Sequence, residues 1–230
     1  MRIAYCVTSW SGAHLQQTIA HIPKGSRVLV VDNSQHGWCL AKAWNYGIER
    51  LCMTEGYDVA IVCNDDILLR PDTGELLAHG LLYGQYEEGY SPELLLLSGR
   101  HAAPNDNRTD EADWDLLNAA EPKWQPGPDF GLFATTRRLF DEVGRFDEGF
   151  NPAFFEDNDM HRRIQLAGFE GGAYAPYWHL LNGTIRTDSE RRGVVMNGGF
   201  EHSRGHYVRK WGGEPGHERY TVPFGGAVAV

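Results

Sequence analysis

The chain has 230 residues, of which 42% are apolar, and this length can bury one sizeable core, so a single domain is the simplest expectation. Its 21 Lys and Arg against 31 Asp and Glu give a formal net charge of -10, which disfavours a polyanion as the default partner. The purely apolar runs of the sequence, such as 94–97, are far too short to span a bilayer, so no membrane span is expected.

The four cysteines show no C-x-x-C spacing, and Cys6 and Cys63 lie inside apolar runs. They are therefore expected to be buried free thiols of a reducing compartment. The first residues contain no long apolar segment followed by a cleavage site, so nothing favours secretion. The sequence indicates a cytoplasmic protein.

Short β-branched runs alternate with helical patterns in the first half of the chain, which is typical of parallel strands joined by crossover helices. Strands are expected at 3–7, 27–31, 57–63 and 93–98. Apolar residues recur at three- and four-residue steps from Leu40 to Leu51, which predicts a helix that ends at Gly56. Pro71 is expected to open the next helix. The sequence thus predicts an α/β fold with a mostly parallel sheet.

The second half begins with a polar stretch, 99–128, that is too long for an ordinary connection and is interpreted as a lid or an acceptor loop. Regular structure is expected to resume after it. The expected elements are a strand at 130–135, helices at 137–143 and 157–167, a strand at 173–177 and a helix near 202–211.

Polar residues follow three of the expected strands where each one ends. They are Thr8-Ser9, Asp32-Asn33 and Asn64-Asp65-Asp66. Because ligands of open parallel sheets bind beyond the carboxyl ends of the strands, these residues are expected to meet in one crevice. Asp65 and Asp66 suit a hard divalent cation that completes its shell with substrate phosphates. A turn or a helix cap explains the same pair equally well.

Two further segments carry candidate chemistry. Glu156 and Asp157 open a helix, and a carboxylate placed between apolar residues there has a raised pKa, which suits it to accept a proton. An ordinary acidic helix N-terminus explains these charges too. His179 ends an aromatic strand and precedes a turn, and a single His is more often structural than a ligand.

Taken in order, these segments resemble the GT-A glycosyltransferases of family 2, and the resemblance covers about residues 1–185. The similar parts are VLVVDNS (28–34), AKAWNYG (41–47), CNDDILLRPD (63–72), DEVGRFDEGFNPAFFEDNDMHRRIQLAG (141–168) and WHLLNGT (178–184). The resemblance implies a GT-A, Rossmann-like domain that uses a nucleotide-diphosphate sugar. The compact size and the segment RKWGGEPGHERYTVPF (209–224) look like those of short phage-encoded members, which would place the protein in the host cytoplasm.

The resemblance also implies a donor site. Thr8, Ser9 and Asp32 would hold the base and ribose, and Asp65 would lie near the ribose or phosphate. Asn64 stands where many relatives have the first Asp of a DxD motif. Asp66 and His179 would bind the metal ion, a donor set that favours Mn²⁺ and leaves Mg²⁺ open.

For catalysis, the resemblance implies that Asp157 is the general base and that Glu156 orients the acceptor or the donor sugar. The reaction would be an in-line displacement that inverts the anomeric carbon. Arg209 and Lys210 are candidates for closing over the diphosphate, although a solvated surface helix is the favoured explanation for them.

The resemblance divides the chain into a nucleotide-sugar half (1–98), an acceptor and catalytic half (99–185) and a tail that closes the site (186–230). The acceptor stays open between a hydroxymethylated base of phage DNA and a glycan. Basic residues of the tail would permit DNA: Arg186, Arg191, Arg192, Arg204, Arg209 and Lys210. A UDP-sugar is the commonest donor of the family, and the oligomeric state is left open.

Two other functions agree less well with the sequence. A sugar nucleotidyltransferase would carry a Gly-rich phosphate loop after the first strand, but TSWSGAH follows Val7 instead. A binding module for nucleotide sugars or polysaccharides would need no catalytic base, and the joint presence of Asp66, Asp157 and His179 disfavours it.

Overall fold

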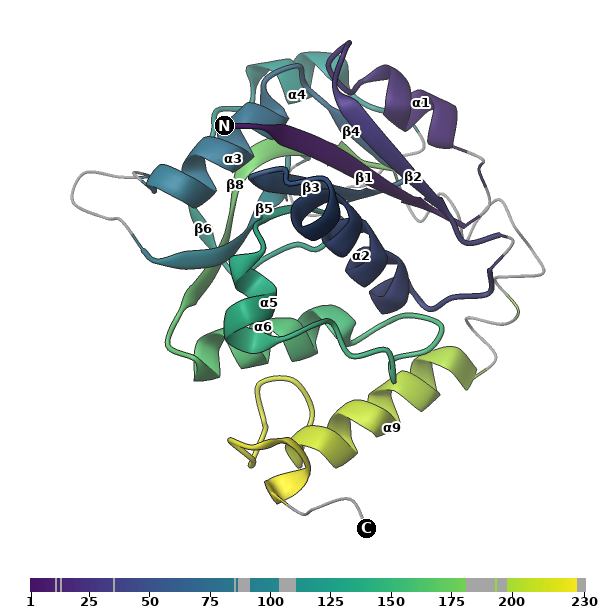
Figure 1. Ribbon diagram of the computed structural model, residues 1–230, viewed down its shortest axis with the longest axis vertical. Coiled ribbons are helices and arrows are strands. Elements are labelled where there is room, and N and C mark those ends of the chain that lie inside the picture. Colours follow the sequence, from purple (N-terminus) through teal and green to yellow (C-terminus); the bar gives the residue numbers. More distant parts are fainter. Residues whose placement is uncertain are drawn as a thin grey trace.

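An eight-stranded sheet forms the centre of the computed structural model (Figure 1). The structure describes residues 1–10, 12, 14–34, 36–84, 86, 92–103, 111–180, 193 and 198–226. The strands are β1 (Ile3–Ser9), β2 (Arg27–Asp32), β3 (Val59–Asn64), β4 (Ile67–Leu69), β5 (Leu94–His101), β6 (Gln125–Pro126), β7 (Leu132–Thr135) and β8 (Glu170–His179). Their order is β2-β1-β3-β7-β5-β8-β4, and β6 pairs with β8.

The sheet is mixed but mostly parallel. Strand β1 is parallel to β2 and β3, and β5 is parallel to β8. Strand β7 runs antiparallel between β3 and β5, while β4 and β6 are antiparallel to β8. Strands β1, β2, β3, β5 and β8 therefore share one direction, which confirms the expected fold class. The reversed direction of the central strand β7 was not predicted.

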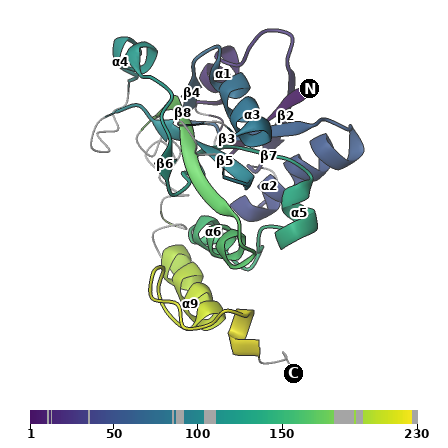
Figure 2. The same cartoon turned by 90° about the vertical axis from the view of Figure 1, so that its left-hand side faces the viewer.

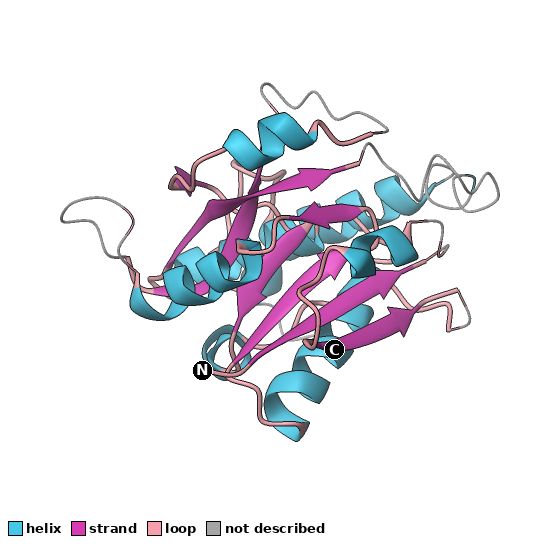
Figure 3. Ribbon diagram, turned by 90° about the horizontal axis from the view of Figure 1, so that it is seen from above, coloured by secondary structure: helices cyan, strands magenta, loops and turns pink. Residues whose placement is uncertain are grey.

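Helices cover both faces of the sheet (Figure 3). They are α1 (Leu15–Ala20), α2 (Leu40–Ile48) with its π-helical continuation Glu49–Thr54, α3 (Thr73–Tyr83), α4 (Trp114–Ala119), α5 (Arg138–Val143), α6 (Glu156–Leu166) and α9 (Phe200–Trp211), with a 3-10 turn at Pro223–Gly226. In Figures 1 and 2, α1 and α3 lie on one side of the sheet and α2, α5 and α6 on the other.

The alternation of side chains along the central strands creates two cores. In β1, Ala4 and Cys6 pack toward α2, whereas Tyr5 and Val7 pack toward α3. Both sets are almost fully buried. A strand covered on both faces reads as a continuous apolar run, which is why 3–7 and 57–63 were recognisable as strands.

The four cysteines belong to this buried interior, and all are free thiols, as expected. Burial raises the pKa of Cys6 to about 12, so the thiol stays protonated. Among the described helices, none has the length and apolar character needed to cross a membrane.

The sequence patterns missed four short elements: α1, β4, α4 and β6. The stretch 99–128, expected to be one long connection, contains the end of β5 and also α4 and β6. The N-cap residue Asp113 accepts a hydrogen bond from Leu116 N, which starts α4. Residues 104–110 of this stretch lie outside the described residues.

The C-terminal helix α9 packs against α6 on the side away from the sheet (Figure 2). Its Tyr207 and Trp211 form a small buried cluster with Phe150. The helix expected near 202–211 is thereby confirmed.

Candidate functional site

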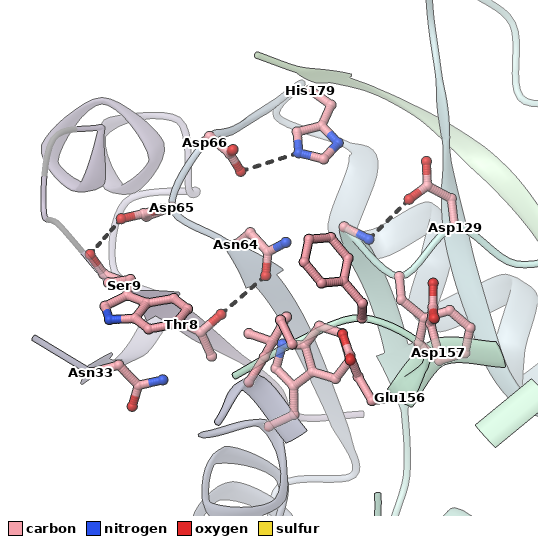
Figure 4. A pocket seen from close by; sticks show the side chains of 17 residues that line it. Thr8, Ser9, Asn33, Asn64, Asp65, Asp66, Asp129, Glu156, Asp157 and His179 are labelled. Atoms are coloured by element: carbon pink, nitrogen blue, oxygen red, sulfur yellow. Dashed lines mark hydrogen bonds and ion pairs between the residues drawn. The ribbon is translucent and has the colours of Figure 1, made fainter. Parts of the chain in front are cut away.

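A pocket of about 360 Å³ opens at the carboxyl ends of β1, β2 and β3 (Figure 4). Its lining comes from segments far apart in the sequence: Thr8, Ser9, Trp10, Asn33, Leu40, Trp44, Asn64, Asp65, Asp66, Asp129, Phe130, Gly131, Ala153, Phe154, Glu156, Asp157 and His179. The expectation that the polar strand ends meet in one crevice is confirmed for β1 and β3 and, at β2, for Asn33.

The turn after β3 is fixed by hydroxyl groups of β1. The register of β1 and β3 places Thr8 opposite Asn64. The Thr8 hydroxyl donates a hydrogen bond to Asn64 Oδ1 at 3.2 Å. Ser9 Oγ donates to Asp65 Oδ2 at 2.5 Å. These contacts hold Asp65 against the sheet and leave the next carboxylate, Asp66, to face the pocket.

Asp66 lies beside His179 at the upper edge of the pocket as drawn in Figure 4. The antiparallel pairing of β4 with β8 places Ile67 opposite His179, and Asp66 Oδ1 lies 3.3 Å from His179 Nε2. Both side chains are largely buried. Gly131 lies close below, since a Cβ atom there would stand 3.2 Å from the imidazole.

Glu156 and Asp157 lie in the wall on the opposite side of the pocket. The chain enters α6 through Phe154 and Phe155, whose φ angles of 78° and 68° are unusual for residues other than glycine. Burial raises the pKa of Glu156 well above its usual range, and the neighbouring Asp157 carboxylate adds to this. Burial also raises the pKa of Asp157, with a smaller contribution from the charge of Asp129.

Asp129 was not singled out from the sequence, although it lines the pocket. Its Oδ1 accepts from Gly131 N at 3.0 Å, and its Oδ2 accepts from the Tyr177 hydroxyl at 2.6 Å. The segment QPGPDF reads as a turn, and no local pattern distinguishes this acid from an ordinary turn residue. Asp129 lies just before β7, and it reaches the pocket through the pairing of β7 with β3 and through its contact with Tyr177 of β8.

Polar atoms with unused hydrogen-bonding capacity gather in this pocket. Within the described part of the chain, the following buried atoms of its lining have no hydrogen-bond partner: Asn33 Oδ1, Trp44 Nε1, Glu156 Oε2 and His179 Nδ1. Leaving a buried polar atom unpaired costs about 1–3 kcal/mol. Their concentration in one cavity indicates that a polar ligand completes it.

Three of the expected site residues lie elsewhere. Asp32 does not line the pocket, because its Oδ1 accepts from Ser34 N at 2.8 Å, and the next residue, Asn33, takes the place beside Thr8. Lys210 is buried, with Nζ 2.6 Å from Asp147 and 2.7 Å from Asp159. Arg209 is exposed on α9. The expected contact of Arg209 and Lys210 with a diphosphate in this pocket does not fit these positions.

The remaining expected residues are brought together. They are Thr8, Ser9, Asn64, Asp65, Asp66, Glu156, Asp157 and His179. In the part of the chain that the structure describes, no group of three or more His, Cys, Asp or Glu side chains is placed to hold a metal ion. An ion at Asp66 and His179 would therefore take its other ligands from a substrate or from water.

No protein-family model matches the chain, and no curated protein matches it either. Solved structures do share its fold. The mannosyltransferase PcManGT from Pyrobaculum calidifontis, in complex with GDP-Man and Mn²⁺, superposes with a TM-score of 0.52 at 13% identity over 94% of this chain and 66% of that one.

Two other solved structures are similar to a comparable degree. A197 from STIV has a TM-score of 0.50 at 14% identity, over 80% of this chain and 87% of that one. GalNAc-T7 with UDP, GalNAc and Mn²⁺ has a TM-score of 0.51 at 14% identity, over 78% of this chain but only 44% of that one. At these identities the likeness shows the fold, and the expected GT-A fold is confirmed.

Proposed function

We propose that this chain is a metal-dependent glycosyltransferase that moves a sugar from a nucleotide-diphosphate sugar to an acceptor hydroxyl. One observation carries the proposal: a single pocket joins a carboxylate and imidazole pair, Asp66 and His179, to a second pair of acids, Glu156 and Asp157. The first pair suits a cation that neutralises a diphosphate, and the second suits removal of a proton from a hydroxyl. The fold is one that solved structures with GDP-Man or UDP and Mn²⁺ share.

Asp66 and His179 fit a divalent cation, either Mn²⁺ or Mg²⁺. Both side chains are largely buried, and His179 Nδ1 has no hydrogen-bond partner in the described part of the chain, while Asp66 Oδ1 has the 3.3 Å contact with His179 Nε2. The mixed oxygen and nitrogen donors favour Mn²⁺. When bound, the ion would stabilise the negative charge of the departing diphosphate.

The side of the pocket formed by β1, β2 and β3 is then assigned to the nucleoside of the donor, with a UDP-sugar as the first candidate. Thr8, Ser9, Asn64 and Asp65 form a hydrogen-bonded group there. Asn33, rather than Asp32, offers the free amide oxygen on this side. Sugar and acceptor are assigned to the opposite side, near α6.

Asp157 is proposed as the general base. Its carboxylate takes the proton of the acceptor hydroxyl while that oxygen bonds to the anomeric carbon and the bond from this carbon to the diphosphate breaks. Attack from the face opposite the leaving group inverts the configuration. Glu156, whose pKa is raised by burial, is proposed to stay neutral and to orient donor sugar or acceptor by a hydrogen bond.

The acceptor is proposed to be either a hydroxymethylated base in phage DNA or a glycan.

The residues that line the pocket come from the proposed donor half (1–98) and from the proposed catalytic half (99–185). No described residue after His179 lines it, and 181–192 and 194–197, which include Arg186, Arg191 and Arg192, lie outside the described residues. Closure of the site by the tail 186–230 therefore stays a proposal.

The test is calorimetric titration of UDP, GDP and their sugar conjugates with Mn²⁺, Mg²⁺ or EDTA, on wild type, Asp66→Ala and the exposed control Asp115→Ala. The expected result is metal-dependent binding of one nucleotide series that Asp66→Ala abolishes and Asp115→Ala retains. Binding of no nucleotide at all would overturn the proposal. Binding without transfer to DNA or to oligosaccharides carrying free hydroxyls would favour a binding module instead.

A further inference from the structure

Helix α9 makes buried polar contacts with the segments that carry the pocket wall. Lys210 Nζ lies 2.7 Å from Asp159 Oδ1, and Trp211 Nε1 donates to the same oxygen at 2.9 Å. The other oxygen of Asp159 accepts from Arg163 Nε at 2.9 Å. Asp159 is fully buried, so its orientation is fixed by these three donors.

Asp159 belongs to the first turn of α6, the turn that carries Glu156 and Asp157. Its backbone N–H donates to Phe155 O at 2.9 Å, which closes this turn. Asp159 itself does not line the pocket. A change in its orientation would therefore act on the reaction only through the turn that it belongs to.

The backbone just before α6 has a second anchor on α9. Ser203, which is fully buried, donates its hydroxyl to Ala153 O at 2.8 Å. Ala153 and Phe154 line the pocket, and Phe154 and Phe155 adopt left-handed backbone conformations that such residues disfavour. The ring of Phe155 packs on Tyr207 of α9, with centroids 5.7 Å apart.

Lys210 also balances charge in this region. Its ammonium group contacts Asp147 at 2.6 Å as well as Asp159, and His206 Nε2 lies 3.0 Å from the same Asp147 oxygen. Without the Lys210 ammonium group, the carboxylates of Asp147 and Asp159 would lose a charged partner. They could regain hydrogen bonds in its place only by moving toward water. Such a movement would shift the start of α6.

We propose that Lys210 and Ser203 are positioning residues: through Asp159 and Ala153 they hold the turn at Phe154–Asp157 in the shape that aims Asp157 at the acceptor. The inference rests on the proposed function for its effect on turnover, but not for its effect on the turn. Helix α9 thus contributes to the reaction from outside the pocket. None of the cations of α9 lines the pocket.

The experiment compares Lys210→Met, Lys210→Arg and Ser203→Ala with wild type in donor binding and in transfer. Lys210→Met is expected to lower kcat by about tenfold or more, because small displacements of reacting groups are costly. The dissociation constant of the donor is expected to stay within about twofold, because the residues assigned to its nucleoside and to the metal ion lie on the other side of the pocket. Lys210→Arg keeps the charge and is expected to restore most of kcat.

Hydrogen exchange gives a readout that needs no activity. Faster exchange is expected in peptides covering 153–160 of Lys210→Met, with β1 and β3 unchanged. A folded Lys210→Met with wild-type kcat and wild-type exchange would overturn the inference. If Lys210→Met does not fold, Ser203→Ala decides, and unchanged kcat and exchange in that variant overturn it. If wild type shows no transfer, the proposed function fails, while exchange still tests the contact.

Discussion

His179 Nε2 and Asp66 Oδ1 lie 3.3 Å apart because β4, a strand of only three residues, pairs antiparallel with the last residues of β8. The pairing continues in the backbone, where Leu180 N donates to Asp66 O at 2.9 Å. The proposed metal pair is thus held by a strand ladder on rigid elements. This rigidity is what makes single substitutions around it informative.

Gly131→Ala is expected to weaken metal-dependent donor binding by about tenfold, since groups that orient a metal ligand commonly contribute this much. The added Cβ would stand 3.2 Å from the His179 ring and from the Tyr177 hydroxyl, so the imidazole would have to shift by a few tenths of an ångström. Titration of Mn²⁺ and donor measures the effect. The control Gly205→Ala meets only the flexible end of Arg209 and should bind as wild type.

Asp157→Asn is expected to lower kcat by about 10²–10⁴-fold, the range for loss of a general base, and to leave donor affinity nearly unchanged. The amide keeps the shape of the carboxylate but cannot accept the proton. Transfer assays with saturating donor measure the effect, and the exposed Asp115→Asn serves as the charge-matched control. Wild-type turnover in Asp157→Asn would remove this residue from the mechanism.

As the solution is acidified, the rate of transfer should begin to fall at a pH above the ordinary pKa of Asp, which is about 4. Burial raises the pKa of Asp157, so its base form is lost at a higher pH than that of an exposed Asp as the solution is acidified. Burial raises the pKa of Glu156 and so favours its neutral form, which Gln resembles, and Glu156→Gln should therefore leave turnover near neutral pH almost unchanged. Loss of activity in Glu156→Gln would mean that Glu156 works as a carboxylate.

Asp147→Asn should lower the free energy of unfolding at pH 7 by about 2 kcal/mol, the scale of a hydrogen bond to a charged group. Burial alone would raise the pKa of Asp147, but hydrogen bonds from His206 and Lys210 outweigh it and lower this pKa. The stabilisation is therefore present above the unfolded pKa of about 4 and is lost as the pH falls toward the lowered value.

Urea unfolding of wild type and of Asp147→Asn at pH 7 and near pH 3 measures the difference in their free energies of unfolding. This difference should be smaller near pH 3. The control Asp141→Asn removes a surface pair in which both side chains are more than half exposed, so it should change stability little at either pH. An equal loss in both variants would assign the effect to surface charge rather than to the docking of α9.

The sequence alone was sufficient for strands β1, β2 and β3 and for most of the expected residues that line the candidate pocket. Buried parallel strands appear as apolar runs, and polar residues at their carboxyl ends must share one edge of the sheet, which is why Thr8 and Asp66 were correctly placed together. The first turn of α6 was recognisable from its acidic start. The stretch 99–128 was misread because α4 and β6 are too short to leave a periodic pattern.

What the tertiary structure decided is the direction in which individual side chains point. Neighbouring residues at a strand end face different ways, so Asn33 enters the pocket while Asp32 caps a turn. Whether a helical lysine faces water or the interior depends on the segments that pack against the helix. Lys210 faces the interior, where it pairs with the carboxylates of Asp147 and Asp159. Asp129 reached the pocket through the pairing of β7 with β3 and through its contact with Tyr177 of β8. Local sequence fixes which residues can form a strand or helix, whereas these orientations depend on contacts between segments that only the complete fold brings together.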